Sequence, residues 1–392
     1  MPVLDLALPG AVPVGDISSR VIEDTGYSRP YIADTGPHRG HRCVVLNTGK
    51  KKYDSKENRD LAVYREVPIA NLMRRGINLP VFNATTSLRK QEWLLLDQVV
   101  LKAARERLRA WGDLAAANTF GGFNGMSKLI LEHETMSDPG EAIIDMDALT
   151  DGRTDSPTYQ LEGLPLPIIH SDFWFGSRRL AASRSTGTPL DTTMAEASGR
   201  RVAETLEKLT IGTLTGPTWG TATDYGRTPT VYGYTNFTNR NTKTNLTTPT
   251  GSNPEVTVSD VLAMRSQLYS DKFYGPYMLY HSTDWDVYMD NDYARLGGSN
   301  ANMTLRDRLR KIEGIQDVRR LDFLASATNP FTLLMVQMTS DVCRAVNGMD
   351  ITTIQWESMG GMRVNFKVMT IQVPQLRADF SGNCGILHAT TS

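Results

Sequence analysis

Few side chains of this 392-residue sequence stand at spacings that support catalysis. The run His170-Ser171-Asp172 holds the residue types of a hydrolytic triad, but neighbours in sequence cannot converge in triad geometry. No Walker-type phosphate loop or dinucleotide fingerprint occurs, and the glycine-rich stretch Gly121–Gly125 follows a helical pattern, which favours a turn. Ser127 lacks the flanking glycines of a nucleophile elbow. We therefore expect no catalytic residue, no cofactor and no enzyme.

Two groups of residues could in principle bind a metal ion: one cluster of histidines and a cysteine, and one pair of aspartates. The stretch His38–Cys43 holds two histidines and a cysteine, but the spacing is short and a fourth ligand is missing. Its two arginines would repel a cation, so a basic loop is favoured. Asp145 and Asp147 could hold calcium, yet no EF-hand spacing or turn glycine accompanies them. We expect solvated carboxylates there and no metal site.

The composition is that of an ordinary globular protein, with 40% hydrophobic and 22% charged residues. The formal net charge of −1 excludes a polycation that coats nucleic acid, so any DNA contact needs a local patch. The 3 cysteines are far apart and odd in number, which indicates a reducing cytosol. The segment 1–15 is interrupted by prolines and lacks a basic start, so we expect no signal peptide and no membrane partner.

Residues 1–86 favour an extended arm that gains order against another subunit. Proline and glycine recur, and between His38 and Arg75 there are ten Lys or Arg against four Asp or Glu. A solvated linker is the alternative. The arm's candidate contact residues are Arg39, Arg42, Lys50, Lys51 and Lys52.

The pattern from Ser87 to Asn118 predicts a helix, and two strand-like runs follow at Ser127–Glu134 and Pro157–Gly163. From Ser127 to Glu162 there are nine acidic residues against two basic ones. A hairpin so negative is better explained as a protruding loop that lies on a positive neighbour than as a self-contained fold. A solvated acidic loop stays the alternative. Its candidate contact residues are Asp138, Glu141, Asp145, Asp147 and Asp151.

The run Thr188-Pro189-Leu190-Asp191 predicts the start of a second long helix. It supplies an N-cap, a proline at the first helical position and an acidic residue. Some 24 residues would give a rod of roughly 35 Å. Further on, the sequence predicts alternating short elements: helices at 257–270, 282–290 and 304–312, and strands at 277–281, 331–338, 351–357 and 362–373. The strand 331–338 is apolar enough to be buried on both faces, whereas alternation in 362–368 predicts one wet face.

One stretch runs Tyr159–Phe173 (YQLEGLPLPIIHSDF), continues through Arg178–Arg184 and ends at Gly187–Asp191. It closely resembles the junction of E-loop and spine helix in shell proteins of the HK97 fold, a family of phage major capsid proteins and encapsulins. Weaker matches follow in the family's order at Tyr232–Asn236, Gly275–Leu279 and Asn347–Ile351.

The resemblance implies an α+β, HK97-like fold with five parts. Residues 1–86 would be the N-terminal arm, 87–126 a helix packing on the P-domain, and 127–163 the E-loop. Residues 164–235 and 340–378 would form the P-domain, with a spine helix at about 189–212. Residues 236–339 and 379–392 would form the A-domain. Lys128 stands at the base of the loop, so we expect no isopeptide crosslink.

The function implied by the resemblance is that of a major capsid protein. Subunits would form hexamers and pentamers of an icosahedral virion shell around double-stranded DNA, assembled in the bacterial cytoplasm. The acidic loop would lie on a neighbour's spine-helix region, at Arg178, Arg179, Arg200 and Arg201. Portal, scaffolding and decoration proteins are the further partners. The alternatives are an encapsulin-type compartment that encloses a cargo enzyme, and an enzyme of mixed α/β fold.

Overall fold

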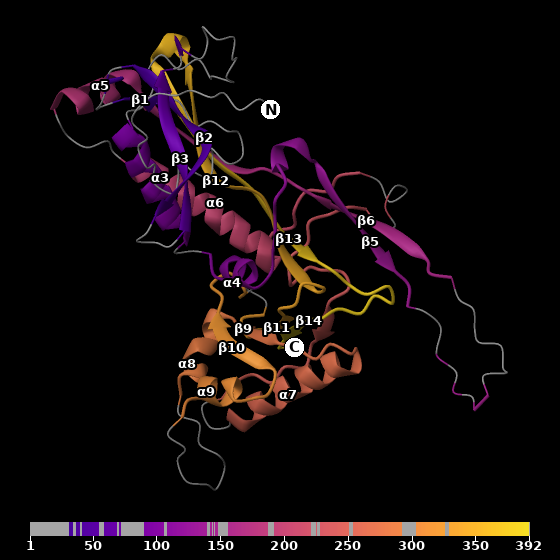
Figure 1. Cartoon of the computed structure of the whole chain (residues 1–392). Helices are drawn as coiled ribbons and strands as arrows, with labels where there is room; N and C mark the ends of the chain where they lie inside the picture. Colours follow the sequence, from indigo (N-terminus) through magenta and orange to yellow (C-terminus); the bar gives the residue numbers. More distant parts are fainter. Residues whose placement is uncertain are drawn as a thin grey trace. The chain divides into compact units, whose positions relative to one another are not determined.

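The computed structural model describes residues 31–33, 37–39, 41–54, 59–68, 70–71, 90–105, 108–138, 142, 144, 146–147, 156–186, 192–220, 225, 228–250, 254–291, 303–325 and 329–391. Helices and strands are mixed along the chain (Figure 1). The chain divides into two compact units. The first comprises Met1–Ala104, His170–Val202 and Ile351–Met369, and the second comprises Arg105–Ile169, Ala203–Asp350 and Thr370–Ser392.

The first unit contains a three-stranded sheet in the order β1-β2-β3, formed by Tyr31–Ile32, Arg42–Asp54 and Arg59–Pro68. The strands β2 and β3 pair antiparallel from Cys43 opposite Pro68 to Asp54 opposite Arg59. This hairpin lies within the segment expected to be an extended arm, and it was not predicted from the sequence. The two strands were not predicted because their sequences lack a sustained alternation of apolar and polar residues, which is the pattern that indicates a strand.

Helix α3 (Lys90–Arg105) buries one face, where Trp93, Leu96, Val100 and Ala104 recur every three or four residues. Its backbone lies close to that of α6 (Thr193–Ile211), since a Cβ at Gly199 would stand 2.9 Å from the carbonyl oxygen of Val100. Glycine is therefore required at this crossing.

A four-stranded sheet has the order β4-β12-β13-β7, formed by Thr119–Phe120, Cys343–Ser358, Arg363–Leu376 and Ile169–Gly176. In the first-unit part of β13, Val364, Phe366 and Val368 are buried, as the alternation predicted. The prediction of a wet face was wrong at Asn365, which is 7% exposed. Its side-chain amide donates a 2.8 Å hydrogen bond to Ser358 Oγ, and this bond lets the amide be buried.

The second unit contains a five-stranded sheet in the order β10-β9-β11-β14-β8, formed by Ile315–Arg320, Tyr277–His281, Thr332–Gln337, Ile386–Thr390 and Asn241–Lys243. Strand β9 pairs parallel with β10 and antiparallel with β11. Every residue of β11 is buried, so the prediction of a strand buried on both faces at 331–338 is confirmed. Helix α7 (Pro254–Ser270) packs against α9 (Leu305–Arg310) and β14, and η2 (Thr283–Trp285) with α8 (Asp286–Met289) completes this part (Figure 1).

The helices differ from the predictions in several places. The single helix predicted at 87–118 is two helices, α3 and α4 (Ala110–Ala117), with Leu108 and Arg109 outside both. Helix α5 (Ser177–Thr186) was not predicted. Helix α6 begins at Thr193, and the Thr192 carbonyl accepts its first hydrogen bond from Glu196 N at 2.9 Å. The predicted start at Thr188–Asp191 lies outside the described residues. Its 19 residues give a rod of roughly 28 Å.

Candidate functional site: the β5–β6 hairpin and its root

Strands β5 (Ile130–Met136) and β6 (Tyr159–Pro165) form an isolated two-stranded antiparallel hairpin that projects from the second unit (Figure 1). The register runs from Ile130 opposite Pro165 to Met136 opposite Tyr159. The sequence predicted these strands two or three residues too early, because Gly125–Ser127 forms the short helix η1 instead.

The hairpin has two unlike faces, because successive side chains alternate. One face carries Leu131, His133 and Thr135 with Glu162 and Leu164, all at least half-buried. The other face carries exposed side chains of two kinds. Its carboxylates are Glu132 and Glu134, and its apolar side chains are Met136, Tyr159 and Leu161, here called the hairpin patch. The acidic residues of this face were predicted from the sequence, and the apolar ones were not.

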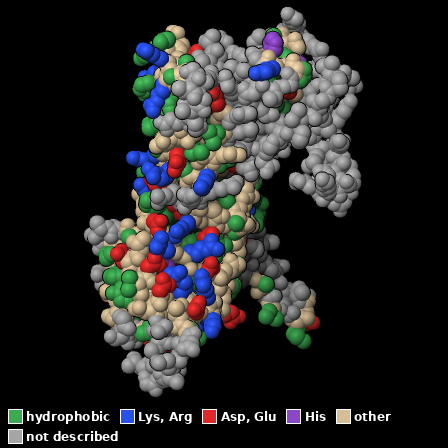
Figure 2. Space-filling view, turned by 90° about the vertical axis from the view of Figure 1, so that its left-hand side faces the viewer, with side chains coloured by type: hydrophobic (Ala, Val, Ile, Leu, Met, Phe, Trp, Pro, Cys, Tyr) green, Lys and Arg blue, Asp and Glu red, His purple; other side chains and the backbone are tan. Residues whose placement is uncertain are grey.

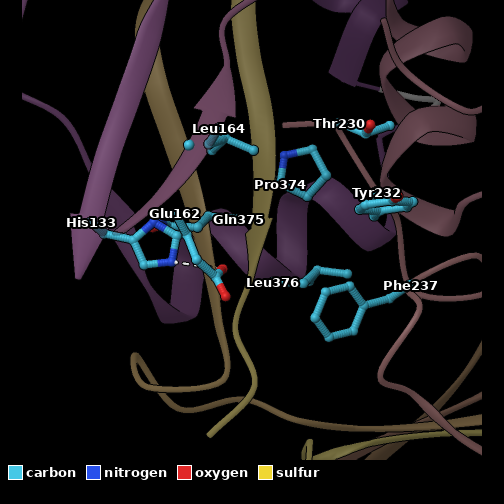
Figure 3. Close-up of a pocket in the computed structure, with 10 residues that line it drawn as sticks. His133, Glu162, Leu164, Thr230, Tyr232, Phe237, Pro374, Gln375 and Leu376 are labelled. Atoms are coloured by element: carbon cyan, nitrogen blue, oxygen red, sulfur yellow. Dashed lines mark hydrogen bonds and ion pairs between the residues drawn. The ribbon is translucent and has the colours of Figure 1, made fainter. Parts of the chain in front are cut away.

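The root of the hairpin is fixed to β13 by a polar contact (Figure 3). His133 Nε2 lies 3.4 Å from Glu162 Oε2, its cross-strand partner, and both side chains are largely buried. On the other side of the ring, Gln375 Nε2 lies 3.3 Å from His133 Nδ1. A glutamine amide can only donate to this nitrogen, so the contact favours the tautomer that carries its proton on Nε2.

A small pocket adjoins this root contact (Figure 3). Leu164, Tyr232, Phe237 and Leu376 contribute its apolar wall. It has room for about one ordered water molecule, far less than a small-molecule site requires. The pocket therefore belongs to the packing of the hairpin root and is not a substrate site.

Two glycines let the hairpin lie close to its support. A Cβ at Gly163 would stand 3.1 Å from the ring of Tyr225, whose hydroxyl donates a 2.9 Å hydrogen bond to Glu132. A Cβ at Gly125 would stand 2.9 Å from the Cα of Gly348 on β12. The backbone of the glycine-rich stretch before the hairpin thus lies close to β12. This agrees with its prediction as a turn and not as a phosphate loop.

The motif Tyr232–Asn236 packs on the C-terminal end of helix α6 and caps it. Gly212 adopts a φ of +97°, and the N–H groups of Tyr234 and Thr235 donate to the carbonyls of Thr210 and Ile211 at 2.9 and 2.8 Å. A Cβ at Gly233 would lie 2.6 Å from Gly212 Cα, so only glycine fits. The motif is a structural C-cap.

A charged network in the second unit was not foreseen. Arg319 of β10 pairs with Asp113 of α4 and, at 2.8 Å, with Asp317, while Arg320 pairs with Asp286 at 2.6 Å. Basic and acidic side chains intermingle on the face shown in Figure 2. Because Asp113 and Asp286 are far from these arginines in the sequence, no local pattern indicates those two pairs.

The side chain of Glu207 caps the N-terminus of helix α4. Its carboxylate accepts hydrogen bonds from the backbone N–H groups of Arg109, Ala110 and Trp111 at 3.2, 2.7 and 3.1 Å. Burial raises the pKa of Glu207 to about 7, against the lowering effect of these three donors. The cap separates α4 from α3, which the periodic pattern had joined.

The predicted contact residues lie on different parts of the chain. Arg39 is exposed in a turn, and Arg42, Lys50, Lys51 and Lys52 belong to β2. Exposed candidates on the acidic segment are Asp138 and Asp147, whereas Glu141, Asp145 and Asp151 lie outside the described residues. Arg178 and Arg179 are exposed on α5, and Arg200 and Arg201 are exposed on α6. The acidic candidates belong to the second unit and the basic ones to the first, and their meeting between copies stays a prediction.

Within the described ranges, no three histidine, cysteine or acidic side chains gather as metal ligands. In the same part of the chain, none of the helices is long and apolar enough to span a bilayer. The three cysteines are buried, and none of them forms a disulfide bond.

Solved structures define the class of fold. The chain resembles the capsid of Myoviridae phage XM1 with a TM-score of 0.51 at 10% identity, over 71% of this chain and 90% of that one. It also resembles a virus-like particle from Pyrococcus furiosus (TM-score 0.49, 16% identity, 75% and 97% covered) and Mycobacterium phage Bobi (0.49, 10%, 84% and 99%). The chain has the HK97-type capsid fold, as the resemblance of its motifs implied.

The family follows from the sequence. A model described as a family of unknown function, DUF6260, matches residues 83–389, and the chain belongs to this family. No curated protein matches the chain.

Proposed function

We propose that this protein is the major capsid protein of a tailed bacteriophage and builds an icosahedral shell around double-stranded DNA. The observation that carries the proposal is the β5–β6 hairpin, which projects from the second unit of a chain of capsid fold and has exposed apolar and acidic side chains on one face. Such a patch of exposed apolar side chains supports a role in binding another protein. The pocket at its root is too small for a substrate.

The mechanism is geometric. Identical subunits make head-to-tail contacts, and such contacts close into rings when the rotation permits. Hexameric and pentameric rings then tile the shell, with the A-domains, 236–339 and 379–392, around each ring axis. The acidic loop of one subunit overlies the next subunit near Arg178, Arg179, Arg200 and Arg201, and the basic arm reaches a further neighbour. DNA contacts the inner face through local charge, and a portal occupies one vertex.

Electron microscopy of the purified full chain tests the proposal. We expect closed particles of uniform diameter, and in phage-infected cells particles with a portal and tail that protect DNA from nuclease. Particles that hold a cargo protein and no genome would instead establish the encapsulin-type compartment. A chain that stays monomeric or forms a small oligomer at high concentration would overturn the shell in both forms.

A further inference from the structure

In the first unit, the sheet of β12, β13 and β7 has one packed face and one open face. On the packed face, the ring of Phe366 on β13 stacks on that of Phe173 on β7, with the two centroids 5.0 Å apart. The side chains of β7 that alternate with Phe173 are exposed, namely His170, Asp172 and Trp174. Because successive side chains of a strand point to opposite faces, these three lie on the open face.

The open face carries two tryptophans, each beside a cation of the central strand β13. The guanidinium of Arg363 lies 4.4 Å from the ring centroid of Trp174 on β7, and the ammonium of Lys367 lies 5.7 Å from that of Trp356 on β12. Trp174 is 53% exposed and Trp356 is half-buried. Since the strand order is β12-β13-β7, the two tryptophans lie on opposite sides of the cationic strand. Aromatic and cationic surface thus extends across all three strands.

The charges on and around the open face are mostly positive. Lys367 Nζ lies 3.6 Å from Asp172 Oδ2, and His170 Nδ1 lies 3.3 Å from the other oxygen of the same carboxylate. Arg178 and Arg179 are exposed at the start of α5, directly after β7. Among the described residues the cations on or beside the face are Arg178, Arg179, Arg363 and Lys367, and the carboxylates are Asp172 and Glu357. A surface with this excess of positive charge attracts a polyanion.

We infer that the open face of β12, β13 and β7 binds single-stranded nucleic acid. Unpaired bases stack on Trp174 and Trp356, and backbone phosphates lie on Arg363 and Lys367. Exposed aromatic side chains on a sheet, with cations between them, suit unpaired bases of any sequence, because every base has a face that can stack. The inference goes beyond the proposed function, since the site lies within one chain and needs no shell.

Double-stranded DNA fits this face less well. In a duplex the faces of the bases are covered by the neighbouring base pairs, and proteins read the grooves with an inserted helix or ribbon. The flat middle of a sheet does not enter a groove, so a duplex would meet only the cations. The two tryptophans would then have no role in binding.

The dimensions of the face suit a short stretch of strand. Arg363 and Lys367 are four residues apart on β13, which separates them by roughly 13 Å at about 3.3 Å per residue. The distance across the sheet from β12 to β7 is roughly 10 Å, because neighbouring strands lie about 4.8 Å apart. About two or three bases stack on a sheet face of this kind. We therefore expect a dissociation constant on the order of 10 μM at low salt.

Fluorescence anisotropy of labelled oligonucleotides with the purified full chain tests the inference. The probes are a deoxythymidine strand of about 12 nucleotides, an abasic strand with the same number of phosphates, and a duplex of the same length. We expect the thymidine strand to bind at least fivefold more tightly than the abasic strand, and more tightly than the duplex, because only this strand offers free bases. Unassembled chains and particles are both measured, and this preference in either form supports the inference. Equal affinity for the thymidine and abasic strands would show a purely electrostatic contact and overturn it.

Variants of the tryptophans identify the stacking surface. Trp174→Ala should weaken binding of the thymidine strand at least fivefold, the loss expected for one stacked base, and Trp174→Phe should restore most of the affinity. Trp219→Ala is the matched control, because Trp219 is 55% exposed in the second unit, and it should change the affinity less than twofold. Full affinity of Trp174→Ala would overturn the inference.

The salt dependence of binding tests the phosphate contacts. Arg363→Gln and Lys367→Gln should each reduce the slope of log affinity against log salt concentration by about 0.7, because each phosphate contact on a single strand releases about that number of counterions. Lys311→Gln, exposed in the second unit, is the control and should leave the slope unchanged. Slopes equal to that of the wild type in both face variants would contradict the assigned phosphate contacts.

The outcomes separate this inference from the proposed function. A chain that forms DNA-filled particles but binds no oligonucleotide in either form overturns the inference alone. If Trp174→Ala also abolishes those particles, the open face is instead a contact between copies of the chain. A chain that prefers the thymidine strand and forms no shell supports the inference and overturns the proposed function.

Discussion

The carboxylate of Glu207 on α6 accepts a 2.7 Å hydrogen bond from the backbone N–H of Ala110, 97 residues earlier in the chain. With Arg109 and Trp111 as further donors, one side chain of the long helix satisfies most of the free N–H groups at the start of α4. The glutamate is 2% exposed, so loss of its carboxylate would leave buried donors without partners.

Replacement of Glu207 is therefore expected to destabilise the protein. Glu207→Ala should lower the free energy of unfolding by about 3 kcal/mol, and Glu207→Gln by roughly half as much, because its amide oxygen still accepts hydrogen bonds. Urea unfolding followed by circular dichroism measures both. Glu196→Ala, exposed in the first turn of the same helix, is the control and should cost less than about 0.5 kcal/mol. Equal stability of all three variants would contradict the role of the cap.

The raised pKa of Glu207 predicts a pH dependence of stability with a defined sign. Between its ordinary value of 4.5 and about 7, the folded chain holds a proton that the unfolded chain has released. The free energy of unfolding should then fall as pH rises through this window, by about 3 kcal/mol in total, and be flat with respect to this group above it. Burial also raises the pKa of Asp113, which acts in the same direction. Comparison of wild type with Glu207→Gln at pH 5, 6 and 7.5 isolates the part due to Glu207; an unchanged slope would refute the assignment.

Gly233 should not tolerate a side chain. The methyl group of Gly233→Ala would overlap Gly212 and the Leu209 carbonyl, which are backbone atoms that cannot move aside singly. We expect a loss of at least about 3 kcal/mol, or failure to fold, measured by thermal unfolding. Gly112→Ala on α4 is the matched control: no atom lies within 4 Å of the added Cβ, and alanine favours a helix, so stability should stay the same or rise.

Charge on the acidic segment should affect assembly and leave folding unchanged. Asp138→Lys with Asp147→Lys should reduce particle yield several-fold in 0.1 M salt, because both side chains are exposed and would face arginines of a neighbour. The defect should lessen in 1 M salt, where screening is stronger. Asp284→Lys, an exposed reversal in η2, controls for net charge. Wild-type yield from the double variant at both salt concentrations would show that these charges do not contribute to the proposed contact.

The sequence by itself determined the elements whose signals are local. Strand β9 was predicted at Tyr277–His281, and β11 and α7 within three residues of their bounds, because apolar runs and caps lie within each segment. The two strands of the hairpin were predicted within three residues of their bounds, and the HK97-type fold was also predicted correctly. The acidic excess of the hairpin was visible as a count of charges.

Only the tertiary structure decided features that depend on partners far along the chain. Glu207 separates α3 from α4 across about a hundred residues, and the hydrogen bond from Asn365 to Ser358 buries an amide that alternation had placed in water. The face of the hairpin on which Met136 and Tyr159 meet follows from the register between β5 and β6. Composition counts charges, but register decides which side chains share a face, because a shift of one residue moves every side chain to the other side.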